Sequence, residues 1–216
     1  VGTIANELFT NIQTLTSLNL RGNRLTGTIP VEMATHTALS QVDLAMNQLT
    51  GTIPEDLASM ESLQTLDLCD NYLTGSIPNN MEALSALTIL KLTDNKLNGK
   101  LPTAAVETNS NLHTVWLSNN LLTGALPTTS VGLVEFKVAN NDLSGSIPKY
   151  SGLQFLDISG NTKLDVSGCA DNMADIDRLS VTIEDCNFPD SIVNSPRSTL
   201  HLSSYYVEGS RECTFS

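Results

Sequence analysis

The sequence repeats one pattern seven times, and this repetition constrains the fold more than any other feature of the chain. Numbering each unit from its first leucine as position 0, apolar residues stand at positions 3 and 5 and an asparagine at position 8. The first six units add a glycine at position 12 and close on Ile-Pro or Leu-Pro. The first leucines are Leu15, Leu39, Leu63, Leu87, Leu112, Leu133 and Leu153.

The spacing within a unit has a direct physical meaning. Apolar residues at positions 3 and 5 point to one side of a short strand, so Leu18 and Leu20 are predicted to face inward. One unit cannot bury this apolar face alone, but stacked units form a continuous core. The asparagine is expected to bond the backbone of adjacent coils. The glycine permits a tight backbone path, and the proline then stops regular pairing.

The first complete unit, Leu-Thr-Ser-Leu-Asn-Leu-Arg-Gly-Asn-Arg-Leu-Thr-Gly-Thr-Ile-Pro over residues 15–30, resembles a plant-type leucine-rich repeat, a subclass also found in algae and other microbial eukaryotes. Relatives of this type include receptor-kinase ectodomains and polygalacturonase-inhibiting proteins. The resemblance implies an α/β repeat fold that is mostly β: a right-handed, curved solenoid with a parallel concave sheet and a carboxyl-terminal cap.

The array is assigned to residues 1–164, as a partial first unit plus seven repeats, and residues 165–216 to a Cys-containing cap. Because residues 2–5 match the end of a repeat, we expect either further protein before Val1 or a partner that covers this end. Short 3₁₀ turns are expected on the convex side, as between Pro54 and Leu63, but the later units are too short for one. Alternation predicts strands over 178–185 and 198–207 of the cap.

The cysteines suggest an oxidising compartment, and therefore a secreted or cell-surface protein. Cys169–Cys186 is the simplest bridge, with Cys213 as an alternative partner. The other interpretation is that all four cysteines are reduced. Cys69 is interpreted as a small filler at the rim of the outward face, with a reactive or intermolecular thiol as the alternative. The sequence contains no Asn-x-Ser/Thr glycosylation site, which argues against a plant cell-surface receptor.

The net charge of -12 disfavours nucleic acid and anionic membranes as partners. No apolar run is long enough to span a bilayer. No catalytic or nucleotide-binding motif occurs, and no cofactor or metal is expected. Asp43 and Asp67 could form a glycosidase pair, but two solvated consensus residues are favoured. A Ca²⁺ site in the acidic run at residues 171–177 is likewise disfavoured.

The outward face of the predicted sheet carries the candidate binding residues. The single Trp of the chain stands at position 4 of its unit, between lysines of the neighbouring units. Such an aromatic residue with adjacent cations suits a protein contact or a sugar-stacking platform, whereas lysine stems covering the indole would make it structural. The predicted ligand-binding residues are Trp116, Lys91, Lys137, His113, Phe155, Asp67 and Asp43.

These features predict a non-enzymatic recognition module for a protein, peptide or polysaccharide, within a longer chain or a larger assembly. A structural, assembly or adhesion role is the alternative. The resemblance to polygalacturonase-inhibiting proteins implies a further alternative, the inhibition of a secreted glycan-degrading enzyme. The regular threonine pairs Thr26/Thr28 and Thr50/Thr52 also suggest ice binding as a hypothesis, although this array breaks at Asn98 and Lys100.

Overall fold

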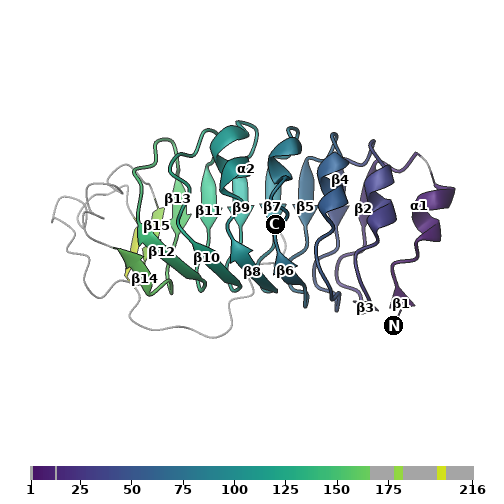
Figure 1. Ribbon diagram of the computed structural model, residues 1–216, viewed down its shortest axis with the longest axis horizontal. Helices are drawn as coiled ribbons and strands as arrows, with labels where there is room; N and C mark the ends of the chain where they lie inside the picture. Colours follow the sequence, from purple (N-terminus) through teal and green to yellow (C-terminus); the bar gives the residue numbers. More distant parts are fainter. Residues whose placement is uncertain (1, 13, 166–177, 182–198, 203–216) are drawn as a thin grey trace.

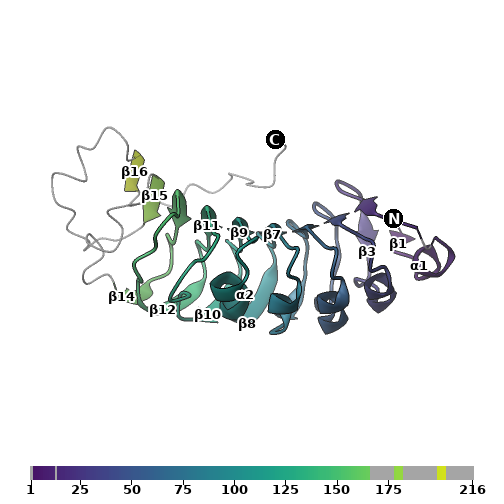
Figure 2. The ribbon, with the colours of Figure 1, turned by 90° about the horizontal axis from the view of Figure 1, so that it is seen from above.

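A computed structural model describes residues 2–12, 14–165, 178–181 and 199–202. The chain winds into a row of coils, with parallel strands along one side and short helices along the opposite side (Figure 1). Seen from above, the row bends into a shallow arc with the strands on its inner side (Figure 2). The predicted leucine-rich-repeat solenoid with a parallel concave sheet is confirmed.

Nine strands form the concave sheet, and every neighbouring pair is parallel. Each of the first seven covers positions 2–4 of its unit, with the position 3 residue buried. The strands are β2 (Ser17–Asn19), β4 (Gln41–Asp43), β5 (Thr65–Asp67), β7 (Ile89–Lys91), β9 (Thr114–Trp116), β11 (Glu135–Lys137), β13 (Phe155–Asp157), β15 (Arg178–Val181) and β16 (Thr199–Leu202).

The last two strands lie in the segment predicted as a cap. They fall within the two predicted cap strands and extend the sheet past β13, with Leu156, Leu179 and Leu200 in one register row. The backbone pairing of the repeats therefore continues beyond the point where the repeat consensus ends. Cys169, Cys186 and Cys213 lie outside the described residues, as do the acidic residues at 171–177.

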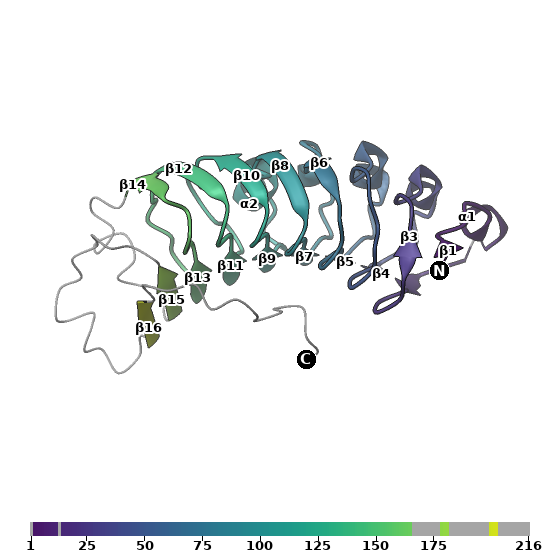
Figure 3. The same ribbon diagram turned by 90° about the horizontal axis from the view of Figure 1, so that it is seen from below.

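A second parallel sheet, which the sequence analysis did not predict, runs along the adjacent side of the solenoid (Figure 3). It consists of β6 (Thr74–Ser76), β8 (Lys96–Lys100), β10 (Leu121–Gly124), β12 (Asp142–Ser146) and β14 (Lys163–Asp165). A separate parallel pair, β1 (Gly2–Thr3) and β3 (Leu25–Thr26), lies at the other end. The glycine at position 12 falls within this sheet at four coils, and each of these strands ends before the proline of its unit.

Threonine hydroxyls link neighbouring coils of this second side. The hydroxyl of Thr50 donates to the carbonyl oxygen of Gly27 at 3.2 Å, and that of Thr74 to Gly51 at 3.2 Å. Because these donors serve the fold and Lys96 is exposed on the same side, the side does not present a continuous hydroxyl array. The ice-binding hypothesis therefore gains no support from this geometry.

Short helices form the convex side, where every one except the first follows the proline that closes a unit; the first follows Ala5 instead. The predicted turn after Pro54 is confirmed as a 3₁₀ helix, and no helix occurs among the described residues 127–153. The helices are α1 (Glu7–Asn11), η1 (Val31–Thr35), η2 (Glu55–Ser59), η3 (Met81–Ala83) and α2 (Thr103–Thr108). None of the helices in the described part of the chain is long and apolar enough to cross a lipid bilayer.

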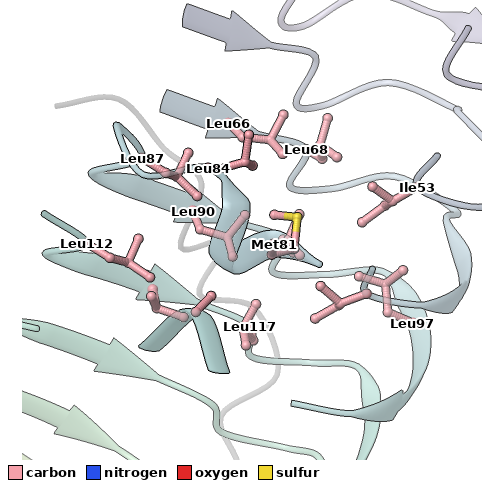
Figure 4. Close-up of a cluster of buried hydrophobic side chains, with 14 of the residues drawn as sticks. Ile53, Leu66, Leu68, Met81, Leu84, Leu87, Leu90, Leu97, Leu112 and Leu117 are labelled. Atoms are coloured by element: carbon pink, nitrogen blue, oxygen red, sulfur yellow. The ribbon is translucent and has the colours of Figure 1, made fainter. Parts of the chain in front are cut away.

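One continuous core fills the space between the two sheets and the convex turns. Figure 4 shows Leu66, Leu90 and Leu117 of successive coils pointing into it, together with Met81 from η3. The asparagines at position 8 complete this core as predicted. The side-chain amide of Asn71 donates to three carbonyl oxygens and accepts the backbone N–H of Leu49.

The burial predicted for two residues needs correction. Asn23, at position 8 of the first complete unit, is exposed and bonds only carbonyls of its own coil. Cys69 was predicted at the rim of the outward face, but its exposed fraction is 0% and it packs with Ala45 and Met46. Position 6 lies where the chain turns away from the sheet, so a neighbouring coil covers it. The buried thiol favours the filler interpretation over a reactive one.

Candidate functional site

The concave sheet brings one residue of every coil into a continuous row. Position 4 is the last residue of each three-residue strand, and the strands pair in register without a slip. We call these residues the position 4 row: Asn19, Asp43, Asp67, Lys91, Trp116, Lys137 and Asp157.

Four members of this row share one structural role. The side-chain oxygen of Asp43 accepts the backbone N–H of Ala45, two residues later, at 3.1 Å. Asn19, Asp67 and Asp157 make the same contact in their own coils. A short Asp or Asn side chain that bonds the backbone two residues on favours a turn, so this residue ends the strand.

Asp43 and Asp67 also share a cation that the sequence analysis did not identify as part of the site. One guanidinium nitrogen of Arg21 lies 3.3 Å from Asp43 and 2.9 Å from Asp67, so this side chain spans three coils. Burial by itself would lower the pKa of Arg21, but the charges of Asp67 and then Asp43 outweigh it and the pKa is raised.

This arrangement does not suit acid–base catalysis. Each carboxylate already accepts hydrogen bonds from Arg21 and from the backbone N–H two residues on, which is the role of a structural side chain rather than of a glycosidase carboxyl. The described residues also contain no group of three or more His, Cys, Asp and Glu side chains that could hold a metal ion. Asp43 and Asp67 thus form an acidic cluster of their own, separate from the central residues of the row.

The centre of the row is a cation–aromatic cluster. The ammonium of Lys91 lies 3.9 Å from the Trp116 ring centroid, and that of Lys137 lies 4.1 Å from it. The Lys137 ammonium also lies 5.1 Å from the Phe155 ring and 3.2 Å from a Glu135 carboxylate oxygen. Each cation–π contact contributes about 0.5–1 kcal/mol when partly exposed. We call Lys91, Trp116, Lys137 and Phe155 the central cluster.

The two lysines limit what the indole can bind. They belong to the strands on either side of β9, and both ammonium groups lie over the ring. A sugar ring stacking on Trp116 would have to displace one of these ammonium groups. The covering by lysine that the sequence analysis raised as an alternative is therefore present, and contact through the ring edge is favoured over stacking.

Three buried polar groups beside the cluster have no hydrogen-bond partner among the described residues. They are the indole nitrogen of Trp116 and the hydroxyls of Thr93 and Ser118. The two hydroxyls stand at position 6, two residues after Lys91 and Trp116 on their chains. Sequence reasoning missed them, although Thr and Ser occur where other coils have alanine. Unpaired buried donors are uncommon in native proteins.

His113 stands apart from the central cluster. It precedes β9, its ring is exposed, and its Nδ1 pairs with the carbonyl oxygen of Asn111. Of the seven predicted residues, the structure thus gathers Lys91, Trp116, Lys137 and Phe155. It places Asp67 and Asp43 with Arg21, four and five coils away from Phe155.

Models of the leucine-rich repeat match residues 14–35 and 37–97. A chain of the BIR3–SERK2 complex from Arabidopsis thaliana is 33% identical, over 72% of this chain and 72% of that chain, with a TM-score of 0.50. The chain belongs to the leucine-rich repeat family. A comparison with curated proteins gave no significant match.

Two further structures resemble this leucine-rich repeat protein. The GASSHO1/SCHENGEN3 ectodomain from Arabidopsis thaliana, solved in complex with CASPARIAN STRIP INTEGRITY FACTOR 2, is 28% identical with a TM-score of 0.65. That match covers 76% of this chain but only 23% of the ectodomain. A plant ice-binding protein is 23% identical over 92% of this chain and 69% of that chain, with a TM-score of 0.67, which shows a shared fold alone.

Proposed function

We propose that this leucine-rich repeat protein is a non-enzymatic recognition module that binds a protein or peptide on its concave sheet. The central cluster is the proposed contact site. One observation carries the proposal: three consecutive coils abandon the strand-ending Asp or Asn at position 4 and place Lys91, Trp116 and Lys137 there instead. That exchange gives up the strand-ending hydrogen bond seen for Asp43 and gains the cation–π contacts on Trp116, and it presents an aromatic ring and two cations to a partner.

The surroundings of the cluster suit a preformed binding surface. The strands are held on both sides by parallel neighbours, so a partner would meet a rigid sheet and lose little free energy to ordering it. The lysines fix the indole, and an immobilised Trp within a polar surround is the usual composition of an interface hot spot.

The relatives favour a protein or peptide over a polysaccharide. The two related structures from Arabidopsis thaliana were solved as complexes, one with CASPARIAN STRIP INTEGRITY FACTOR 2 and one between BIR3 and SERK2. By analogy with such ectodomains, a secreted or cell-surface location and membership of a larger receptor-like chain belong to the proposal. A secreted glycan-degrading enzyme is one protein partner this surface would accommodate.

A second candidate function is an assembly role through the second side of the solenoid. Tyr72 and Leu121 are 50% and 60% exposed there, one on each side of Lys96 along the stack of coils. Exposed large apolar side chains on one surface are typical of contact sites. This function would leave Trp116 without effect on partner binding.

Paired alanine variants separate the two functions. The purified parent chain and its variants Trp116→Ala and Tyr72→Ala would each be used to capture partners from the native source. Quantitative mass spectrometry would measure the capture. Both changes remove an aromatic ring beside a lysine ammonium, so each controls for the other. We expect capture to be lost only with Trp116→Ala. Loss only with Tyr72→Ala would support the assembly role and contradict the proposed function.

A further inference from the structure

The positive charge of Lys91 is the feature of the central cluster that the proposed function does not yet explain. The Lys137 side chain is 14% exposed and already has the Glu135 carboxylate at 3.2 Å. Asp67, next to Lys91 in the sheet, is held by Arg21 at 2.9 Å. Among the described residues, no carboxylate lies within 4.0 Å of the Lys91 ammonium, whose one assigned contact is the Trp116 ring. Lys91 therefore offers a positive charge without a carboxylate partner.

The neighbouring polar groups also lack hydrogen-bond partners among the described residues. An indole nitrogen can only donate, and the nitrogen of Trp116 is buried without a partner. The hydroxyls of Thr93 and Ser118 are buried and unpartnered as well, at exposed fractions of 0% and 1% for the two residues. Because the Lys91 ammonium and the indole nitrogen can only donate, a ligand that brings an acceptor oxygen, above all a carboxylate, suits this surface better than one that brings more donors.

An apolar residue stands beside the open charge. Ile89 is two residues before Lys91 on β7, on the same outward face, and is half-buried. The equivalent residues of the three preceding coils are polar: Ser17, Gln41 and Thr65. Positions i and i+2 of a strand are separated by about 7 Å, the same spacing as alternate residues of an extended peptide.

We infer that the concave surface selects an extended peptide segment with a carboxylate side chain two residues from an aliphatic or aromatic one. The carboxylate pairs with Lys91, and the apolar side chain packs on Ile89 and the edge of Trp116. The inference rests on the proposed function and adds the chemistry of the partner. A chain of net charge -12 repels anions in general, so binding an acidic segment would depend on this local site.

A peptide array tests this selection directly. Ten-residue synthetic segments would carry one of four residue pairs at alternate positions: Glu with Leu, Gln with Leu, Lys with Leu, or Glu with Ser. The full chain should retain the Glu–Leu group, because only that pair satisfies both the cation and the apolar contact. Titration calorimetry with the best Glu–Leu segment then gives the affinity of each variant.

Two substitutions at one position and one control sharpen the test. Lys91→Gln should weaken the Glu–Leu segment about tenfold, as expected for a charge-assisted hydrogen bond. Lys91→Glu should shift the preference of the array to the Lys–Leu group. Lys96→Gln should change nothing, since Lys96 also lies over an aromatic ring, 5.4 Å from that of Tyr72, but on the second side. Thermal melts establish that each variant is folded.

The outcomes separate this inference from the function on which it rests. If the Gln–Leu or Lys–Leu group binds as well as Glu–Leu while Trp116→Ala abolishes binding, the charge selection is wrong and the recognition site stands. If no group binds but partner capture still depends on Trp116, the peptide inference is likewise overturned. If binding survives both Trp116→Ala and Lys91→Gln, the ligand lies elsewhere and the proposed function fails with it.

Discussion

At the scale of single residues, one asparagine in each coil after the first complete coil joins that coil to the preceding one. The Asn71 amide donates to the carbonyls of Leu44, Leu68 and Cys69 and accepts the N–H of Leu49, so it joins two coils. Asn95, Asn120, Asn141 and Asn161 repeat the same pattern. The asparagine thereby supplies hydrogen bonds to the backbone of a turn that has no neighbouring strand to pair with.

Removing this side chain should therefore be costly. Asn71→Ala leaves buried backbone groups without partners, and we expect it to lower the free energy of unfolding by about 3 kcal/mol. Urea denaturation measures the change. Asn23→Ala is the matched control, because Asn23 is exposed and bonds only two carbonyls of its own coil, and it should lose less than about 1 kcal/mol. Equal losses would mean that the bonds between coils contribute little.

The glycines at position 12 are fixed by backbone conformation and by contact together. Gly51 has a φ of 78°, and a Cβ added there would lie 2.8 Å from the Thr28 methyl. Gly51→Ala should lower the free energy of unfolding by about 2 kcal/mol. Gly22 has a similar φ of 68°, but a Cβ added there would have nothing within 4 Å. Gly22→Ala should therefore lower the free energy of unfolding by only about 1 kcal/mol. Denaturation of Gly51→Ala with Thr28→Ser should recover the difference; no recovery would exclude the methyl contact as its cause.

At the scale of elements, the length of a unit decides what forms on the convex side. Units of 24 residues fit a 3₁₀ helix, and the 25-residue unit that contains α2 fits an α-helical turn. The shorter units that follow have no helix between residues 127 and 153, and the buried ring of Tyr150 lies there instead. It packs edge-on against Phe136, and its hydroxyl donates to the Pro127 carbonyl at 2.8 Å.

Tyr150 should make stability depend on alkaline pH. Burial, and then the Glu107 carboxylate, raise the pKa of Tyr150 above its ordinary value of 10.0. Its contribution is complete below pH 10 and falls as the pH rises further, because the unfolded chain loses the proton first. At pH 8, Tyr150→Phe should be about 1 kcal/mol less stable than the parent. By pH 11 the stability of the parent relative to Tyr150→Phe should fall by about 1.4 kcal/mol, so the variant becomes slightly the more stable of the two.

Urea denaturation of both proteins at the two pH values measures this effect. The remaining tyrosines are common to both chains, so their titration cancels in the comparison. A stability difference that stays constant between pH 8 and pH 11 would show that Tyr150 ionises alike in the folded and unfolded states.

At the scale of the whole molecule, one core and two sheets join all the coils, so each coil depends on its neighbours. The concave sheet does not stop with the repeat consensus but continues through β15 and β16. These strands cover the edge of β13, pairing Phe155 with Arg178 and Asp157 with Ser180. An uncovered parallel edge would expose unpaired backbone groups and the end of the apolar core.

Truncation tests the contribution of these two strands. A chain that ends at Asp165 should melt several degrees below the full chain and self-associate, because β13 becomes an open edge. A chain that ends at Leu202 keeps both strands and is the matched comparison. Calorimetry and light scattering measure the two effects. Identical melting temperatures for the two truncated chains would show that β15 and β16 do not protect the array.

The sequence by itself determined the coil, because a leucine, an asparagine and a glycine at fixed spacing impose local geometry that each unit repeats. It also identified the position 4 row, since alternation along a strand assigns residues to faces and stacking aligns them. It therefore placed Trp116 between Lys91 and Lys137 correctly.

Only the tertiary structure decided what the side chains of that row contact. Arg21 reaches Asp43 and Asp67 across two coils, both lysines lie on the same indole, and a neighbouring coil buries Cys69. These contacts join residues more than 20 positions apart, through long side chains whose rotamers depend on the packing of all coils together. The spacing of residues within one unit carries no record of such contacts, because they exist only after the units stack.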